Sequence, residues 1–219
     1  RELVNSNAFG FNTTLMEYDD RLEPFGNTGQ TLTYTSGFSR ERFSLQTDGT
    51  YRADRTPMLA GMIARRNQDG SSTMRDKNGT VRTFGSDGWI RSLTDRNGNT
   101  VTIVRSGSQI QQIIEPGGRA LTFQYGGGGI SQITDPLGRT VTYTYAAVPP
   151  TTPPPGTGGP VLHTVQNPAG GLTTYSYDGR FNLLTITDAR GITYLTNTYC
   201  SGGNCPLDPA VVSQTMADG

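Results

Sequence analysis

The chain has 219 residues, and its 18 basic residues balance its 18 acidic residues, so the formal net charge is zero. A neutral chain lacks the basic face that nucleic-acid binding requires and the polybasic cluster that holds proteins on anionic membranes. The absence of a run of about 18 apolar residues argues against a membrane-spanning helix. One histidine, His163, excludes a multi-histidine metal site, and the only lysine, Lys77, lies in no phosphate-binding or Schiff-base motif.

Residues 1–47 are expected to form an irregular β segment. Polar and apolar residues alternate in Thr31–Thr35 and Arg42–Leu45, which is the period of a strand with one buried face. An acidic cluster lies in the same segment. Two carboxylates at suitable separation could hydrolyse glycosides, but such clusters are far more commonly solvated acidic faces, and we expect one here. Its members are Glu17, Asp19, Asp20 and Glu23.

Residues 48–88 are expected to form a β-meander that precedes a region of regular repeats, with a boundary near 85–90. Turn-forming pairs recur every nine or ten residues from Asp69 onward. One stretch, Pro57–Arg66, has apolar residues at helical spacing, but its neighbours on both sides have strand patterns, and we expect a strand there. The pairs are Asp48-Gly49, Asp69-Gly70, Asn78-Gly79, Asp87-Gly88 and Asn97-Gly98.

Residues 89–199 contain five units of about 20 residues that share one turn signature. Each unit has a glycine preceded three positions earlier by a short polar residue, and proline fills the intervening second position in three units. The polar side chain can accept hydrogen bonds from its own backbone, and the glycine can adopt the left-handed conformation at the fourth position. The anchor pairs are Asp95 and Gly98, Glu115 and Gly118, Asp135 and Gly138, Asn167 and Gly170, and Asp188 and Gly191.

Alternating residues flank each turn, so each unit predicts a β-hairpin. A lone hairpin is marginal in water, and neighbouring hairpins must therefore pair along a strip. The predicted fold is all-β, with consecutive antiparallel β-hairpin repeats that form a curved strip or part of a hollow shell. A proline-rich insert at 146–160 interrupts the pattern as a loop, and residues 200–219 contain a cysteine loop and the start of a further repeat.

The repeat resembles the RHS, or YD-repeat, family. The resemblance rests on Ile130–Tyr145, on Thr174–Leu183 with its literal Tyr177-Asp178-Gly179, and on five units in phase. It implies a long β strip that spirals into a hollow shell, which in bacterial members encloses a C-terminal toxic polypeptide. Related shells occur in insecticidal toxin complexes and in teneurins. The family's C-terminal autoproteolysis motif has no match here, so the resemblance implies an N-terminal part of a shell.

Other groups have less specific patterns. The Asp-x-x-Gly carboxylates could bind calcium, but their turn role already explains them. Trp89 is expected to pack, and His163 to face solvent or line a shell. The tyrosines at equivalent positions are expected to pack as cross-strand ladders, while contact with a glycan or a partner protein stays an alternative for Tyr143, Tyr145, Tyr175 and Tyr177.

These patterns predict a structural role as part of a shell or scaffold of a secreted or surface-displayed bacterial protein that encloses or displays a C-terminal, toxin-like polypeptide. The alternative is an extracellular adhesin module that binds carbohydrate or protein. We expect no catalytic residue, cofactor, metal or nucleic-acid partner. An open strip leaves two edges for the rest of a longer chain or for neighbouring copies, and an encapsulated toxin is a further possible partner.

The chain's two cysteines, Cys200 and Cys205, flank a short glycine-containing loop and can approach each other easily. A disulfide there suits an extracellular protein, although free thiols stay an alternative. Titration of the native, unreduced protein with a thiol reagent should therefore find no reactive sulfhydryl, while the reduced, denatured protein should give two. Two reactive sulfhydryls before reduction would contradict the disulfide.

Overall fold

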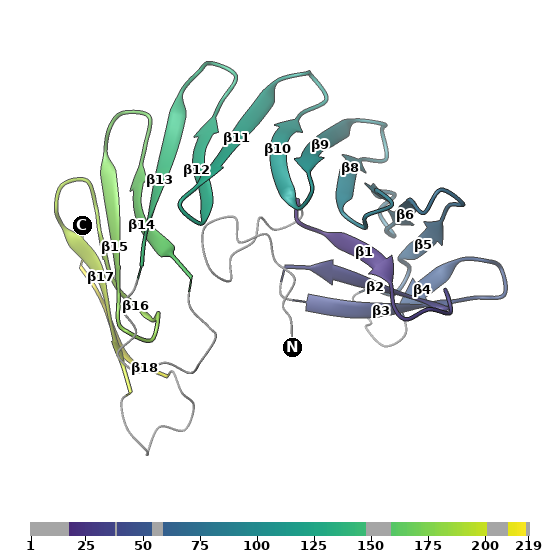
Figure 1. Cartoon of the computed structure of the whole chain (residues 1–219), viewed down its shortest axis with the longest axis horizontal. Helices are drawn as coiled ribbons and strands as arrows, with labels where there is room; N and C mark the ends of the chain where they lie inside the picture. Colours follow the sequence, from purple (N-terminus) through teal and green to yellow (C-terminus); the bar gives the residue numbers. More distant parts are fainter. Residues whose placement is uncertain (1–17, 38, 54–58, 148–158, 201–209, 218–219) are drawn as a thin grey trace. The chain divides into compact units, whose positions relative to one another are not determined.

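A computed structural model describes residues 18–37, 39–53, 59–147, 159–200 and 210–217. These residues form 18 β-strands of one sheet and no α-helix, and the pairs whose register is established are antiparallel (Figure 1). The all-β, hairpin-repeat prediction is therefore confirmed. The strands are β1 (Arg21–Pro24), β2 (Thr31–Ser36), β3 (Ser39–Leu45), β4 (Tyr51–Ala53), β5 (Ile63–Arg66), β6 (Ser72–Arg75), β7 (Val81–Phe84), β8 (Ile90–Thr94), β9 (Thr100–Ser106), β10 (Gln109–Ile114), β11 (Ala120–Gly126), β12 (Gly129–Thr134), β13 (Thr140–Ala146), β14 (Val161–Gln166), β15 (Leu172–Tyr177), β16 (Leu183–Thr187), β17 (Thr193–Tyr199) and β18 (Val211–Met216).

The chain divides into two compact units that part within β11, between Thr122 and Phe123. The sequence placed a boundary near 85–90, where the regular repeats begin. The difference arises because a change of sequence pattern need not end a core. Ile103 on β9 and Ile110 on β10 are as deeply buried as the residues of the preceding meander, so the first hairpin repeat belongs to the first unit.

In the first unit, β1 closes the strands β1 to β8 into a ring. On one side β1 pairs with β2 in register from Arg21↔Thr35 to Pro24↔Leu32. On the other side it meets the start of β8, where Leu22 N–H donates to Gly88 O at 2.9 Å and Ile90 N–H donates to Asp20 O at 3.1 Å. A Cβ at Gly88 would lie 3.0 Å from Leu22 O, so this approach requires glycine.

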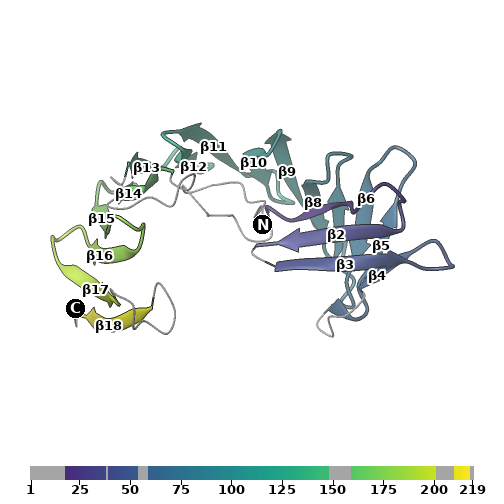
Figure 2. The ribbon, with the colours of Figure 1, turned by 60° about the horizontal axis from the view of Figure 1, so that its bottom comes forward.

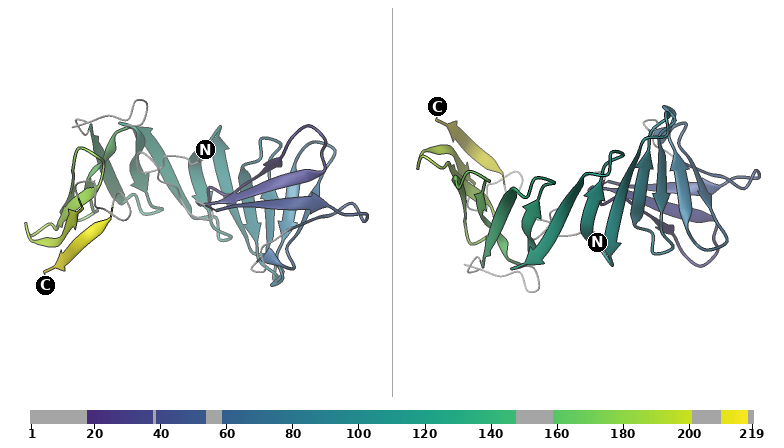
Figure 3. Two further views of the ribbon diagram at one scale, coloured as in Figure 1. Left: turned by 90° about the horizontal axis from the view of Figure 1, so that it is seen from below. Right: turned by 90° about the horizontal axis from the view of Figure 1, so that it is seen from above.

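The ring encloses a core to which its strands contribute from facing sides. Figures 2 and 3 show β2 and β3 lying across the later strands of the unit. The Tyr34 ring on β2 packs edge-on against Phe43 on β3 and Phe84 on β7, with centroids 6.3 and 6.4 Å apart. Residues 21–45 and the 48–88 meander therefore share one core. The large side chains that are almost completely buried include Phe43, Phe84, Leu32, Met74 and Ile90.

The stretch with helical spacing is a turn and a strand. Met62 N–H donates to Leu59 O at 2.9 Å, and β5 follows directly, with Ala64 fully buried opposite Tyr51 and Met74. Strand pairing on both sides outweighs a local helical pattern, as expected; residues 54–58 lie outside the described part.

In the second unit, each strand from β12 to β18 pairs with the next along the chain. The proline-rich insert leaves from the end of β13 and returns at β14, because Ala146 pairs with Val161. Its residues 148–158 lie outside the described part. A long loop between paired strand ends costs little additional closure entropy, so the ladder continues past the insert.

The turn after β10 offers a test of the glycine requirement, since it contains two adjacent glycines. Gly118 has φ +84° and open space where a Cβ would be, whereas Gly117 has no left-handed φ and would meet only Glu115 Oε1 at 3.3 Å. Gly118→Ala should cost about 1 kcal/mol of unfolding free energy from backbone strain alone. Gly117→Ala, the matched control, should be neutral or slightly stabilising in the same urea titration. Equal effects would contradict a conformational role.

Candidate functional site

The ten repeat anchors form five turns with one geometry. In each turn the glycine N–H donates to the carbonyl of the polar residue three positions earlier, at 2.9–3.1 Å. That polar residue's own N–H donates to the carbonyl of the residue after the glycine, at 2.9–3.0 Å. These two bonds define a turn followed by a left-handed residue. The glycines have positive φ, at Gly98 (+89°), Gly118 (+84°), Gly138 (+79°), Gly170 (+86°) and Gly191 (+81°).

In every anchor turn except that of Glu115, the side chain of the polar residue accepts two hydrogen bonds from the backbone of its own turn. Asp135 Oδ1 accepts hydrogen bonds from Leu137 N–H and Arg139 N–H, both at 2.9 Å. Asn167 Oδ1 accepts the equivalent pair at 3.0 and 2.9 Å, so an amide oxygen serves as well as a carboxylate. Glu115 is one methylene longer and instead binds the Arg119 guanidinium. The same double acceptance recurs at Asp76, Asp95, Asp178 and Asp188.

Hydrogen bonding lowers the pKa of these carboxyl groups. At Asp95 the largest cause is the hydrogen bond from the Asn99 side chain, and at Asp188 it is the bond from Ile192 N–H. Desolvation alone would raise the pKa of Asp135, but the hydrogen bonds from Arg139 and Leu137 outweigh it. The carboxylates are thus engaged in turn closure, and the described residues contain no cluster of three or more candidate metal-binding side chains.

One turn departs from the glycine rule. In the turn that begins at Asp178, the residue with left-handed backbone is Phe181, at φ +67°, where the five anchor turns have glycine. Its N–H still donates to Asp178 O at 3.1 Å, and Asn182 N–H donates to Asp178 Oδ1 at 2.9 Å. Because Gly179 lies two residues earlier, the Tyr-Asp-Gly motif alone does not indicate that Phe181 is the residue with left-handed backbone.

Aromatic and aliphatic side chains at matched registers line one side of the second unit's sheet. Tyr143 pairs with Val165 across β13 and β14. Tyr175 pairs with Ile186, which in turn pairs with Leu195. Tyr143, Tyr145, Tyr175 and Tyr177 are all half-buried, and burial raises the pKa of each. We name this set the aromatic face; its members are Tyr143, Tyr145, Val165, Tyr175, Tyr177, Ile186 and Leu195.

The tyrosines of this face pack along the sheet as the cross-strand pattern indicates. Tyr145 Oη donates to Ile130 O at 2.6 Å, so its hydroxyl is satisfied by the backbone of a neighbouring repeat strand. The pKa of Tyr143 is raised first by burial and then by its neighbour Tyr175. The pKa of Tyr175 is raised in the same way, first by burial and then by Tyr194.

Hydroxyl side chains form pairs on the residues that alternate with the aromatic face. Thr144 and Thr164 place their Oγ1 atoms 2.6 Å apart, and Thr187 and Thr193 place theirs 2.9 Å apart. Ser176 Oγ lies 2.5 Å from Thr185 Oγ1. Such pairs each contribute about 0.2–1 kcal/mol, so both faces of the strip stabilise the pairing.

The acidic cluster is not the solvated face that the sequence suggested. Asp19 and Asp20 are only 6% and 1% exposed, while Glu23 pairs with Arg21 at 2.9 Å and Glu17 lies outside the described residues. The expectation is wrong because β1 returns to β8 and carries the two aspartates into the first unit. Local sequence contains no signal of such a contact.

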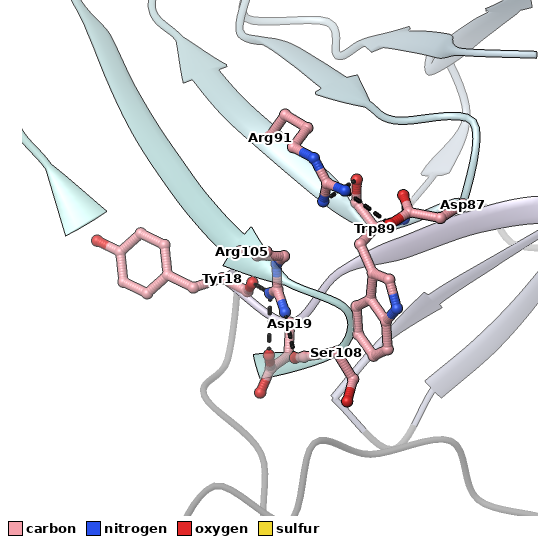
Figure 4. A network of polar contacts seen from close by, with 7 residues as sticks. All are labelled: Tyr18, Asp19, Asp87, Trp89, Arg91, Arg105 and Ser108. Atoms are coloured by element: carbon pink, nitrogen blue, oxygen red, sulfur yellow. Dashed lines mark hydrogen bonds and ion pairs between the residues drawn. The ribbon is translucent and has the colours of Figure 1, made fainter. Parts of the chain in front are cut away.

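Arg105 on β9 binds the first of these aspartates, Asp19 (Figure 4). Its completely buried guanidinium binds Asp19 Oδ1 at 3.0 Å, Ser108 O at 2.7 Å and the Tyr18 carbonyl. The same guanidinium lies 4.8 Å from the Trp89 ring centroid, and Arg21 lies 5.1 Å from it. Trp89 therefore packs between two arginines, as a packing residue rather than a ligand platform, and the network ties β1 to β8 and β9.

The second aspartate, Asp20, lies in the ring's interior beside Tyr34 and Arg82. Tyr34 Oη donates to Asp20 Oδ2 at 2.5 Å, and Arg82 Nε lies 3.5 Å from the same oxygen. Burial, and then the charge of Asp20, raise the pKa of Tyr34, so its hydroxyl stays protonated. The Arg82 guanidinium compensates the charge of this buried carboxylate.

The remaining sequence candidates are placed as follows. His163 is exposed on β14, with Nδ1 3.3 Å from Tyr175 O. Cys200 follows β17, where its N–H donates to Ala210 O at 2.9 Å, whereas Cys205 lies outside the described residues and the disulfide stays a prediction. No helix in the described segments is long and apolar enough to cross a membrane.

Comparison with protein families agrees with this geometry. Residues 162–193, which include all of β14 but its first residue, the Asn167 turn, β15, the Phe181 turn and β16, match the model of the RHS Repeat family. This part of the chain is therefore similar to an RHS repeat. No curated protein matches the chain.

The lowered turn pKa values predict acid sensitivity. A carboxyl group whose pKa is lower in the folded state stabilises the fold above its unfolded pKa of about 4, and this stability is lost as the pH falls through the lowered value. The melting temperature should therefore fall as the pH drops below about 4 and toward the lowered folded-state pKa values. In the variant D95N/D135N/D188N the fall should be smaller, because asparagine keeps the turn bonds, as at Asn167, without titrating. An unchanged acid profile would contradict the assignment.

Proposed function

We propose that this chain is a wall segment of a hollow RHS-repeat shell that encloses or displays a C-terminal, toxin-like polypeptide. The observation that supports the proposal is the continuous ladder of hairpins with an aromatic face and a hydroxyl-lined face. A sheet whose backbone groups are paired and whose two faces differ in polarity can separate an interior from water without any reactive group. The proposed role is structural and includes no catalysis.

We further propose that the protein is secreted or displayed on a bacterial surface, as is typical of RHS-repeat proteins. The predicted pairing of Cys200 with Cys205 is consistent with an oxidising compartment. The balanced charge and the exposed hydroxyl pairs suit a wall that contacts water on one side.

Limited proteolysis of the full-length protein that contains this chain tests the proposal. The C-terminal polypeptide should resist a protease concentration that digests the same polypeptide expressed alone, because the wall excludes the protease. The polypeptide mixed in trans with the 219-residue chain serves as the control and should be digested. Equal digestion rates in the intact protein and in isolation would overturn enclosure.

A second candidate is an adhesin module, and the partial exposure of the tyrosine row supports it. Tyr194 is 38% exposed beside the half-buried Tyr175, and exposed aromatic rings stack on sugars. On a glycan array, the chain should then bind in a manner lost in the Tyr143→Ala, Tyr175→Ala double variant. Absence of binding by the unaltered chain would remove this candidate and leave the shell proposal untouched.

A further inference from the structure

The chain's charges are unevenly distributed, although their sum is zero. Residues 59–99 contain seven basic and four acidic residues, whereas residues 123–219 contain three basic and five acidic residues. The strands β4 to β8 contain six arginines and no acidic residue. A neutral chain therefore has a locally basic surface on its first unit. The arginines are Arg52, Arg65, Arg66, Arg75, Arg82 and Arg91.

Three of these arginines lie on the outward side of β4, β5 and β6. Ala64 on β5 is fully buried, so its neighbours Ile63 and Arg65 face away from the core. Ile63 pairs with Arg52 on β4 and with Arg75 on β6. Because neighbouring strands lie about 4.8 Å apart, the Cα atoms of Arg52 and Arg75 are about 10 Å apart. All three arginines are exposed, and we name them the arginine face.

The described chain leaves most of the charge on this face unneutralised. Arg52 lies 3.6 Å from Asp48, and both side chains are about half exposed, at 47% and 54%. An exposed pair of this kind is weak and exchanges readily for a ligand. Within the described segments, no ion pair joins Arg65 or Arg75 to another residue. Their guanidinium groups can therefore accept an external anion.

The acidic residues nearest in sequence lie in the turns, where they are already bonded. Asp69 Oδ1 accepts hydrogen bonds from the N–H and the Oγ of Ser71, at 2.9 and 2.7 Å. Asp76 Oδ2 lies 3.5 Å from Nη1 of Arg82, which is on the inward side of β7. The carboxylates thus serve turn closure and the inward arginine.

Hydroxyl groups extend the arginine face across the sheet. Arg65 pairs with Thr73, which pairs with Thr83, which in turn pairs with Ser92. The three hydroxyl residues are half-buried, so they form a low row beside the exposed arginines. The surface combines spaced cations with neutral hydrogen-bonding groups.

We propose that the arginine face binds an extended polysaccharide that carries uronic-acid carboxylates. A guanidinium forms two parallel N–H···O bonds with a planar carboxylate. The separation of the arginines suits charges that are spaced along a polymer, and the hydroxyl row can bond to the sugar units between them. This face belongs to the first unit, whereas the tyrosine row belongs to the second.

Other anionic partners fit the face less well. Single-stranded nucleic acid stacks its bases on aromatic rings, and the aromatic residues of β4 to β8, Tyr51 and Phe84, are buried in the core. Duplex DNA depends on many phosphate contacts, and the face has three arginines. An acidic peptide cannot add as a strand, because β5 and β6 each pair on both sides.

Fluorescence polarisation of labelled hyaluronan oligosaccharides, titrated with the 219-residue chain, tests the proposal. Hyaluronan alternates a uronate with an uncharged sugar. The Arg65→Gln, Arg75→Gln variant should raise the Kd at least about tenfold, because two charge-assisted contacts are lost. The matched control, Arg139→Gln, Arg190→Gln, removes the same charge from side chains that are 65% exposed in the second unit, and it should leave the Kd unchanged. The Kd should also rise with added salt.

Competition identifies the class of partner. Unlabelled hyaluronan should displace the probe, whereas neutral dextran, duplex DNA and polyglutamate should not. The Arg65→Lys, Arg75→Lys variant should keep only part of the affinity, since an ammonium lacks the planar fork. Lack of hyaluronan binding, equal weakening by both glutamine variants, full affinity in the lysine variant, or preference for DNA or polyglutamate would overturn the proposal. Melting curves should show that every variant folds, and none of these outcomes bears on enclosure by the full-length shell.

Discussion

The fold depends on a small hydrogen-bonded turn that is repeated between strands. A short carboxylate or amide accepts two backbone N–H groups, and the residue three positions later adopts a left-handed conformation. Each element is local, with Asp135 bonding to residues two and four positions ahead. Because the turn fixes the spacing between paired strands, a succession of such turns produces a ladder of hairpins. The cost of placing Phe181 in the glycine position shows that the strand pairing can tolerate one strained turn.

The two ends of the ladder differ because different interactions act there. At the start, Arg105, Asp19 and Trp89 hold β1 against β8 and β9, and a buried ion pair of this kind is costly to break on one side only. At the end, β18 offers backbone groups and apolar side chains with no such partner network in the described chain. The first end therefore forms a closed core, whereas every residue of β18 is exposed.

The aromatic and hydroxyl-lined faces stabilise the second unit beside its few buried apolar side chains, Phe123, Ile130 and Val161. Tyr143, Tyr145, Tyr175 and Tyr177 are half-buried, and hydroxyl pairs such as Thr144 with Thr164 add stability from the other face. Stability is distributed along the ladder, as in other repeat proteins. A sheet that is stabilised in this way does not depend on one packed centre.

The sequence by itself determined the repeated features: the hairpin period, the anchor positions from Asp95 to Gly191, the placement of the insert, and a resemblance to RHS repeats that the family model matches at residues 162–193. These depend on contacts within a few residues, and local patterns report such contacts directly. Tertiary structure decided what depends on distant contacts. Asp19 and Asp20 look like a solvated acidic cluster until β1 meets residues about 70 positions later at Gly88 and Ile90. Likewise, only the paired strands reveal that the first repeat joins the first core and that Phe181 bears the left-handed backbone. The hydrophobic period and the turn residues are local features that can be read from the sequence. Closure of the ring depends on which distant strands pair, and no local pattern specifies that pairing.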